Sequence, residues 1–242
     1  MPRSGFTFAA IATLLSCLGV HGLISQDAED EAMLAEFQKV LTAGKQADAV
    51  RILSKLISQF PNSASTVRAQ SRFSLRVDAP AELKGVDDDL QVVRDYRKRW
   101  LGFAPVVYDG LLKNRKLPDA SARLDWKPLQ GLDAEALTIY MEQGVVLREI
   151  GKSGQKSQFD NASNVFANVA LSSPPTSEFW WAGKYETLVT LVDRAGPTDA
   201  KLAGAGLANL ERSHPEFDEG KFGLKDRFVA LKARIQAATK DR

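Results

Sequence analysis

The sequence predicts an all-α protein in which antiparallel helix pairs stack as a short α-solenoid. From about residue 28 onward, apolar side chains recur at offsets of three and four residues, which is the period of one helix face. One further pattern occurs three times: an alanine, an apolar residue four positions later, another after three more, and a proline five positions beyond. Its copies are Ala49, Leu53, Leu56 and Pro61; Ala162, Phe166, Val169 and Pro174; and Ala203, Leu207, Leu210 and Pro215.

Residues 1–22 have the features of a secretory signal peptide. Arg3 is followed by the apolar, uncharged stretch 6–20, and the chain turns acidic soon afterwards. We therefore expect an exported protein, periplasmic or secreted, that is cleaved after Gly22. Two alternatives stay open. The stretch that ends at Cys17 resembles a bacterial lipobox, in which this cysteine would carry a lipid anchor, and an uncleaved segment would hold the chain at a membrane.

The composition narrows the classes of function. The chain has 32 basic and 30 acidic side chains, so its net charge of +2 gives no electrostatic reason to expect nucleic-acid binding. Cys17 is the single cysteine of the sequence. Its removal with a signal peptide would exclude disulfides and cysteine-based metal sites from the mature chain.

The first predicted unit is an N-terminal helical repeat over residues 28–73. Helices are expected over 28–43, 46–59 and 62–73. Pro61 ends the second of them, because the residue before a proline is pushed out of the α region. Ser63 or Ser65 is expected to cap the third.

A connecting segment, 74–131, mixes helical and irregular sequence. The three aspartates from Asp87 to Asp89 are interpreted as the start of a helix, where negative charge suits the helix dipole. Gly102 and Pro105 are expected to break or kink that helix. Residues 113–131 contain two prolines and no helical stripe, so they are expected to form a domain boundary or a functional loop.

Residues 132–240 are expected to form the C-terminal helical repeats and a terminal capping helix over 221–240. Each copy of the repeated pattern describes a helix that packs along one stripe and then stops. Offsets of zero, four and seven residues fall on one helix face. The alanine lets a neighbouring helix approach, the two apolar residues fill the space between helices, and the proline ends the helix.

This pattern resembles the second helix of a tetratricopeptide repeat. The first helix of that repeat carries a large, a small and a large residue at offsets that Tyr140, Gly144 and Leu147 match. Two other candidate first helices depart from it, because Phe37 and Tyr185 stand where a small residue belongs. The resemblance covers about 28–73 and 133–240. It implies an α-helical solenoid whose concave face binds a partner.

No pattern in the sequence indicates a catalytic residue, a cofactor or a metal ion. His214 directly precedes a proline, where a capping or surface role is expected, and no nucleophile-elbow, Walker, Rossmann or zinc-binding motif is present. Gly151 to Gly154 resembles the end of a P-loop but lacks its upstream glycine, so a turn between helices is expected. The basic run from Arg94 to Arg99 is interpreted as a solvated face opposite a packed stripe of Tyr96 and Trp100.

We therefore expect a non-catalytic module of the cell envelope that mediates protein–protein interaction or assembly. A protein or peptide partner would lie in a groove between helix pairs. Repeat geometry gives Tyr140, Gln143, Trp180 and Lys184, all on first helices, as the candidate partner-binding residues. Neither nucleic acid nor a cofactor is expected, and contact with a membrane only through an anchor at the N-terminus.

The alternative function is the binding or cleavage of envelope glycans. Phe179, Trp180 and Trp181 are adjacent, so they cannot all face one core on a helix. Trp181 fits the packed stripe, which leaves Trp180 as a candidate platform for a sugar ring, together with Trp126. Burial of Phe179 and Trp180 against a neighbouring repeat is the competing interpretation.

Overall fold

The computed structural model describes residues 20–77, 83–122, 127–196, 198–217 and 221–240. All regular elements within this part of the chain are α-helices, which confirms the predicted all-α class. They are α1 (Val20–Thr42), α2 (Gln46–Gln59), α3 (Ala64–Arg76), α4 (Asp87–Asn114), α5 (Ala134–Lys152), α6 (Gln158–Leu171), α7 (Glu178–Arg194), α8 (Asp199–Ser213) and α9 (Lys225–Lys240). None of the described helices is both long enough and apolar enough to cross a membrane. The predicted signal peptide, apart from its last residues in α1, and Cys17 lie outside the described residues.

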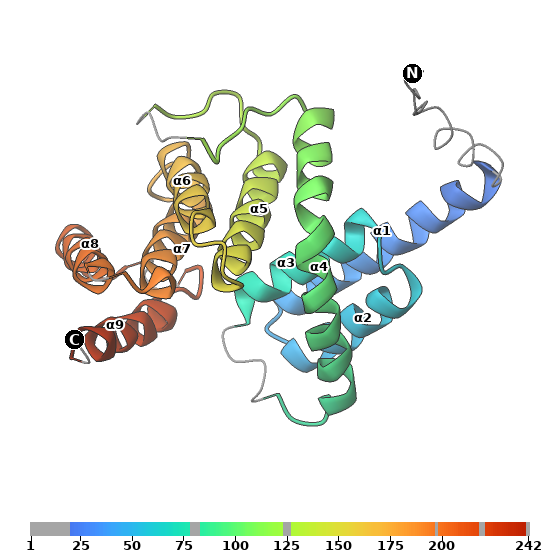
Figure 1. Ribbon diagram of the computed structural model, residues 1–242, viewed down its shortest axis with the longest axis horizontal. Helices are drawn as coiled ribbons and strands as arrows, with labels where there is room; N and C mark the ends of the chain where they lie inside the picture. Colours follow the sequence, from blue (N-terminus) through green and yellow to red (C-terminus); the bar gives the residue numbers. More distant parts are fainter. Residues whose placement is uncertain (1–19, 78–82, 123–126, 197, 218–220, 241–242) are drawn as a thin grey trace, which may run out of the picture.

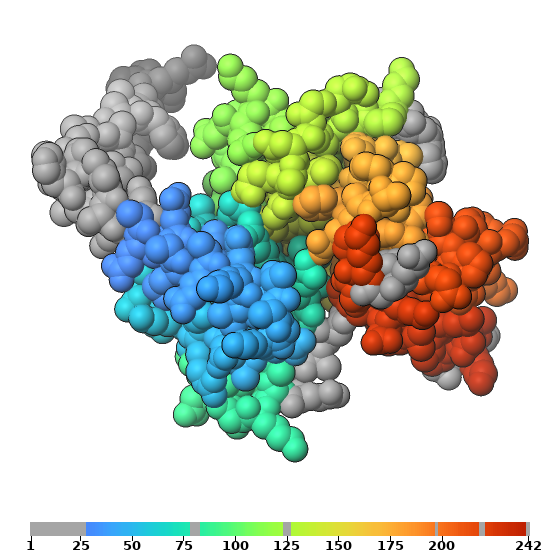
Figure 2. Space-filling model, turned by 180° about the vertical axis from the view of Figure 1, so that it is seen from behind, coloured from blue at the N-terminus to red at the C-terminus, as the bar shows by residue number. Residues whose placement is uncertain are grey.

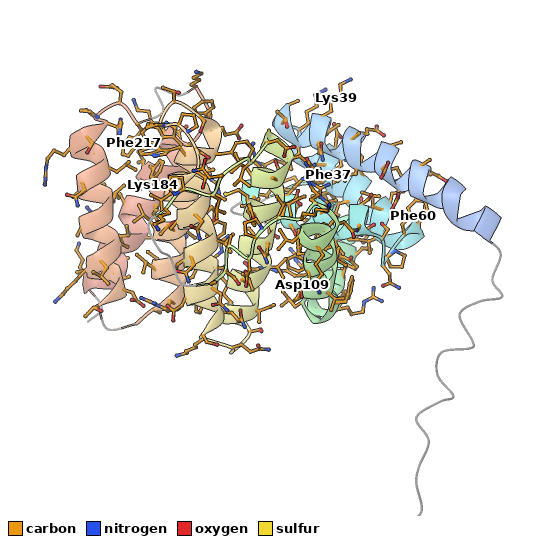
Figure 3. The ribbon with its side chains drawn as sticks, turned by 90° about the horizontal axis from the view of Figure 1, so that it is seen from above. Phe37, Lys39, Phe60, Asp109, Lys184 and Phe217 are labelled. Atoms are coloured by element: carbon orange, nitrogen blue, oxygen red, sulfur yellow. The ribbon has the colours of Figure 1, made fainter. Side chains whose placement is uncertain are left out.

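The helices form two groups that meet along α3, α4 and α5 (Figure 1). In the N-terminal group, α1, α2 and α3 pack on one another, and α4 lies against α2, α3 and α5. In the C-terminal group each helix from α5 to α9 contacts the next one along the chain. Alternate helices also touch, α5 with α7 and α7 with α9. Figure 3 shows the helices of this group in a row, seen from above.

The short helices begin and end where local sequence signals place them. The bounds of α2 are those predicted, and the backbone N–H of Phe60 closes its last turn on the carbonyl of Leu56 at 2.7 Å. Ser63 is the cap of α3, because its hydroxyl accepts the backbone N–H of Thr66 at 3.1 Å. Asp87 to Asp89 form the first turn of α4, as predicted. These elements are therefore specified by contacts between residues close in the chain.

Gly102 and Pro105 were predicted to break or kink the helix, and the break is absent, because α4 runs through both residues. Proline removes one backbone hydrogen bond and crowds the preceding turn. Trp100, Ala104 and Tyr108, one turn apart, are fully buried along the same stripe. Packing of these side chains outweighs the local cost. The helix around Arg94 to Arg99 was predicted to have a packed aromatic stripe and a basic face, and burial agrees with this. Tyr96 and Trp100 are buried, while the basic residues of the run are exposed or half-buried.

The thrice-repeated pattern lies on α2, α6 and α8, and the alanine and both apolar residues of every copy are buried. Each of these helices packs on the helix that precedes it. Gly144 on α5 faces Phe166 on α6 so closely that an added Cβ would lie 2.5 Å from the ring. The small residue is therefore what allows the aromatic ring to enter between the two helices.

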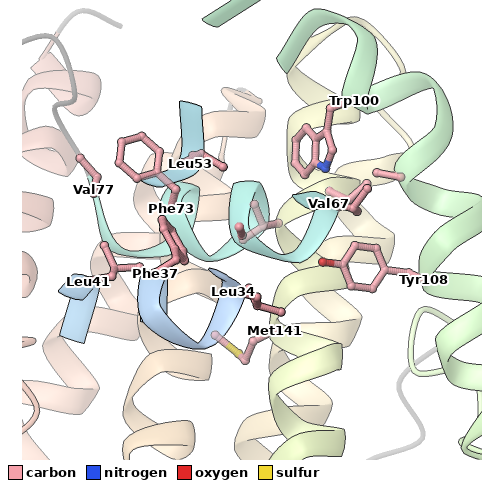
Figure 4. Close-up of a cluster of buried hydrophobic side chains, with 14 of the residues drawn as sticks. Leu34, Phe37, Leu41, Leu53, Val67, Phe73, Val77, Trp100, Tyr108 and Met141 are labelled. Atoms are coloured by element: carbon pink, nitrogen blue, oxygen red, sulfur yellow. The ribbon is translucent and has the colours of Figure 1, made fainter. Parts of the chain in front are cut away.

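Two hydrophobic clusters hold the molecule together. The larger cluster extends from α1 to α6 and includes Trp100, Tyr108 and Phe37 as fully buried side chains. Figure 4 shows Phe37 close to Phe73 toward one end of α3, with Trp100 and Tyr108 toward its other end, by Val67. The smaller cluster joins α7, α8 and α9. Because the larger cluster includes α4, described residues of the segment 74–131 contribute to the core.

Residues 115–133, between α4 and α5, are irregular as predicted over their described part. Side chains of α6 hold this segment by hydrogen bonds from the amide of Asn164 to the carbonyl of Ser121 (3.1 Å) and from the amide of Asn168 to the carbonyl of Ala120 (3.0 Å). The segment therefore lies against α6.

The close approach of α6 and α7 predicts opposite effects for two glycine substitutions. An added Cβ at Gly183 would lie 2.8 Å from the carbonyl oxygen of Phe166 and 3.0 Å from the backbone nitrogen of Ala170. We expect Gly183→Ala to lower the free energy of unfolding by about 1–3 kcal/mol, because backbone atoms cannot move aside alone. Denaturant unfolding measures the change.

Gly102→Ala is the matched control, since Gly102 is an exposed helical glycine with nothing within 4 Å of an added Cβ. Its intrinsic helix propensity should raise the free energy of unfolding by roughly 0.5–1 kcal/mol. Equal effects of the two substitutions would contradict the tight packing at Gly183.

Candidate functional site

The four predicted partner-binding residues do not meet in one groove. Tyr140 is fully buried, and its hydroxyl donates to the carbonyl of Pro118 at 2.7 Å. Burial raises the pKa of the Tyr140 phenol to about 12, so it stays protonated. The prediction that Tyr140 contacts a partner is therefore corrected: the irregular segment after α4 covers this face of α5, and repeat geometry alone does not include that segment.

The other three predicted residues lie in two separate pockets. Gln143, only 8% exposed, lines a pocket of about 400 Å³ between α4, α5 and α6. Trp180 and Lys184 line a pocket of about 370 Å³ between α7 and α8, and Figure 3 labels Lys184 on its helix. His214 ends α8 and places its ring 5.2 Å from the ring of Trp180. Trp126 lies outside the described residues.

A different site lies where the two groups of helices face each other, and we call it the cationic groove. Its walls are α3 and α4 on one side and α7 and α9 on the other, with the C-terminal end of α5 between them. Its volume of about 370 Å³ is in the range of small-ligand pockets. The groove is lined by the apolar side chains of Phe73, Val77, Leu90, Val93, Val189 and Leu231. Its charged side chains are Arg94, Arg97, Arg148, Lys152 and Arg234, with the carboxylates Glu149 and Asp193.

Figure 2 shows the molecule from behind, with the N-terminal helices in blue and the C-terminal helices in red as separate masses that face each other across a hollow. The cationic groove is formed between these groups of helices. Neither group contains the site by itself.

A chain of ion pairs links four helices across the groove. Arg97 on α4 pairs with Glu149 on α5, whose other oxygen lies 3.1 Å from Nζ of Lys152. Lys152 also pairs with Asp193 on α7 at 2.9 Å, and Asp193 accepts from Arg234 on α9 at 2.8 Å. These contacts fix the relative positions of the walls.

The Glu149 carboxylate lies inside this chain of charges. Burial alone would raise the pKa of Glu149, but Lys152, Arg97 and Arg148 together hold it below the ordinary value of 4.5. Burial also acts to lower the pKa of Arg148, while neighbouring carboxylates, Glu186 foremost, raise it. Both groups are therefore charged at neutral pH.

Besides Oδ2 of Asp193, which lies in the ion pair with Lys152, two deeply buried side-chain atoms of groove-lining residues lack hydrogen-bond partners among the described residues. Gln70 is 1% exposed, and its Oε1 accepts no hydrogen bond, while its amide donates to Ser74 at 3.3 Å. Arg148 is 4% exposed and pairs with Glu186, but its Nε lies 3.7 Å from Asp193, too far for a hydrogen bond. Because buried polar groups are normally paired, a bound ligand is one way to satisfy both atoms.

The groove has the chemistry of a binding site. The described residues contain no group of three or more His, Cys, Asp or Glu side chains placed to hold a metal ion. What the groove does offer is fixed positive charge between apolar walls, which suits the recognition of an anionic, partly apolar ligand.

Sequence reasoning did not identify these residues as a site. Arg94 and Arg97 were interpreted as part of a solvated helix face, and Arg148, Lys152 and Arg234 stood out by no local pattern. One feature of the sequence could have indicated them. Arg148 and Lys152 lie one and two helical turns after Gly144, so they continue the same row along α5.

Comparison of the chain with family models, with curated protein sequences and with solved structures finds no match.

The lowered pKa of Glu149 predicts how acid affects the groove. A carboxylate with a lowered folded-state pKa stabilises the fold above its unfolded pKa, and this contribution is lost as the pH falls through the folded-state value. We expect wild type to be more stable than Glu149→Gln at neutral pH, and the difference to shrink as the pH falls below about 4.5. Denaturant unfolding over a pH series measures it. A difference that stays constant would show that Glu149 is not held in this ion-pair chain.

Proposed function

We propose that this protein is a non-catalytic, exported helical-repeat protein that binds a segment of a partner protein in the cationic groove, as an interaction or assembly module of the cell envelope. The observation that carries the proposal is the groove itself. It lies between two groups of helices, has apolar walls, and is lined by residues with buried polar atoms, among them Oε1 of Gln70 and Nε of Arg148, that lack hydrogen-bond partners among the described residues. Such a combination is typical of a recognition site.

The packing of the C-terminal helices supports a solenoid of tetratricopeptide type. Each of α6 and α8 packs on the helices before and after it, and α5, α7 and α9 touch one another in turn. In this arrangement α5, α7 and α9 are the first helices of successive pairs, and residues of all three line the groove. The proposal therefore keeps the prediction that first helices bind the partner, but it assigns the binding to different residues of these helices.

Export to the envelope is supported by the sequence of residues 1–22, with its cationic start and apolar stretch. An interaction module in that compartment would meet envelope proteins as partners.

Filling the groove should abolish partner binding. Ala230 is exposed on α9 and lines the groove, so an indole in Ala230→Trp has room to enter it without disturbing the core. We expect envelope proteins that immobilised wild type retains, as identified by mass spectrometry, to be lost from this variant.

Val229→Trp is the matched control, because Val229 is 59% exposed on the same helix and does not line the groove. It should retain the same proteins, and both variants should show wild-type helical circular dichroism. Retention by Ala230→Trp at the wild-type level would overturn the assignment of binding to this groove.

Glycan binding is the second candidate function, and the pocket of Trp180 favours it. Here the Trp180 ring is half-buried, Lys184 lies 5.4 Å from its centroid, and Asn209 and Ser213 line the same pocket. An aromatic face beside polar side chains suits a sugar ring.

This second function predicts that soluble oligosaccharides from the envelope change the tryptophan fluorescence of wild type but not of Trp180→Phe. Replacement by phenylalanine keeps an aromatic ring in place and removes the fluorophore at the pocket. Identical quenching of both proteins would assign the signal to another tryptophan and remove the support for this pocket.

A further inference from the structure

The charge of the cationic groove is unbalanced at its mouth. Five cationic side chains and two carboxylates line it. Arg97, Arg148 and Lys152 are paired with carboxylates. Arg94, by contrast, is exposed and forms no ion pair with any described residue, and Arg234 keeps 49% of its side chain exposed while sharing Asp193 with Lys152. Arg94 on α4 therefore supplies an unpaired charge on one wall, and Arg234 on α9 supplies a partly compensated one on the other, because it shares Asp193 with Lys152.

Besides Oδ2 of Asp193, which lies 2.9 Å from Nζ of Lys152, the groove lining has one buried acceptor and one buried donor without a hydrogen-bond partner. Oε1 of Gln70 and Nε of Arg148 belong to side chains that are 1% and 4% exposed, and neither atom has a hydrogen-bond partner in the described chain. A peptide unit supplies the complementary pair, an N–H and a C=O. A fully ionised inorganic anion would satisfy only the donor, because it has no hydrogen to give to Gln70.

The walls add a requirement for apolar groups. Phe73, Leu90 and Val93 approach from the N-terminal side, and Val189 and Leu231 from the C-terminal side. These side chains are at most 6% exposed, and a ligand that carries only charge would leave their small exposed parts in contact with water. A polypeptide that combines carboxylates with apolar side chains fits both features.

We propose that the cationic groove binds an acidic segment of its partner, with carboxylates on Arg94 and Arg234, main-chain amides on Gln70 and Arg148, and apolar side chains between the walls. This inference rests on the proposed function and adds the chemistry of the ligand. Electrostatic attraction between the carboxylates and the two arginines makes the affinity depend on salt.

The test uses fluorescein-labelled peptides and the purified protein. One peptide alternates leucine with glutamate, and a second replaces every glutamate by glutamine. We expect fluorescence anisotropy to detect binding of the glutamate peptide alone, weaker at higher salt. The double variant Arg94→Gln with Arg234→Gln should raise its Kd roughly tenfold or more, since it removes two charge-assisted contacts.

Arg99→Gln is the matched control, because Arg99 is an exposed arginine of α4 that does not line the groove. It should leave the Kd within about twofold of wild type, which separates contact at the groove from the loss of net charge. Gln70→Leu should weaken binding without changing the salt dependence, because it removes an acceptor and no charge. All variants are checked by thermal unfolding.

The outcomes separate this inference from the function on which it rests. Equal binding of the two peptides, or equal effects of the Arg99 and the double substitutions, would overturn the acidic ligand while leaving peptide binding intact. Absence of binding by both peptides, when Ala230→Trp still abolishes capture of envelope proteins, would overturn it in favour of a folded protein surface. If Ala230→Trp has no effect on capture, the proposed function itself fails.

Discussion

One buried carboxylate, that of Glu142 on α5, determines how the two groups of helices meet. It is fully buried and accepts hydrogen bonds from Nε of Arg68 at 2.9 Å and from the guanidinium of Arg72. The hydroxyl of Tyr108 on α4 lies 3.3 Å from it and donates. A carboxylate in the core is costly unless charged donors surround it, so α3, α4 and α5 have to come together at this point. Removal of one partner would leave uncompensated charge in the interior, which makes the junction specific as well as tight.

The groove follows from this junction. Because Arg68 and Arg72 lie one turn apart on α3, their pairing with Glu142 fixes the rotation of that helix about its axis. With that rotation, Gln70 and Phe73 of the same helix line the groove. The exposed pair of Arg76 with Glu178 continues the contact to α7, but an ion pair at 42% exposure on each side adds little energy. The buried arginines, Arg68 and Arg72, therefore fix the orientation of α3, and the exposed Arg76 adds little to it.

The features that were predictable from sequence are those that depend on neighbours within one or two helical turns. The Ala, apolar and Pro spacing, the cap at Ser63 and the acidic start of α4 all act locally, and all lie where they were predicted. The break expected at Pro105 failed because buried aromatic residues of α4 pack against other helices. The pairing of Arg68 with Glu142 joins residues 74 positions apart and has no periodicity, so no pattern in the sequence predicts it. The burial of Tyr140 had the same kind of cause, a segment of irregular sequence folding back over α5.

The same reasoning explains why the site lies at the junction rather than on a single repeat. Residues of α5, α7 and α9 line one side of the groove, and α3 and α4 stand opposite them, so the groove has two walls. Ion pairs neutralise the charges deepest between the walls, where an unpaired charge would be most costly. Arg94 and Arg234, nearest to solvent, are the cations for which hydration makes incomplete pairing tolerable. If the groove binds an anionic ligand as proposed, the interior pairs would supply rigidity and the outer cations would supply attraction.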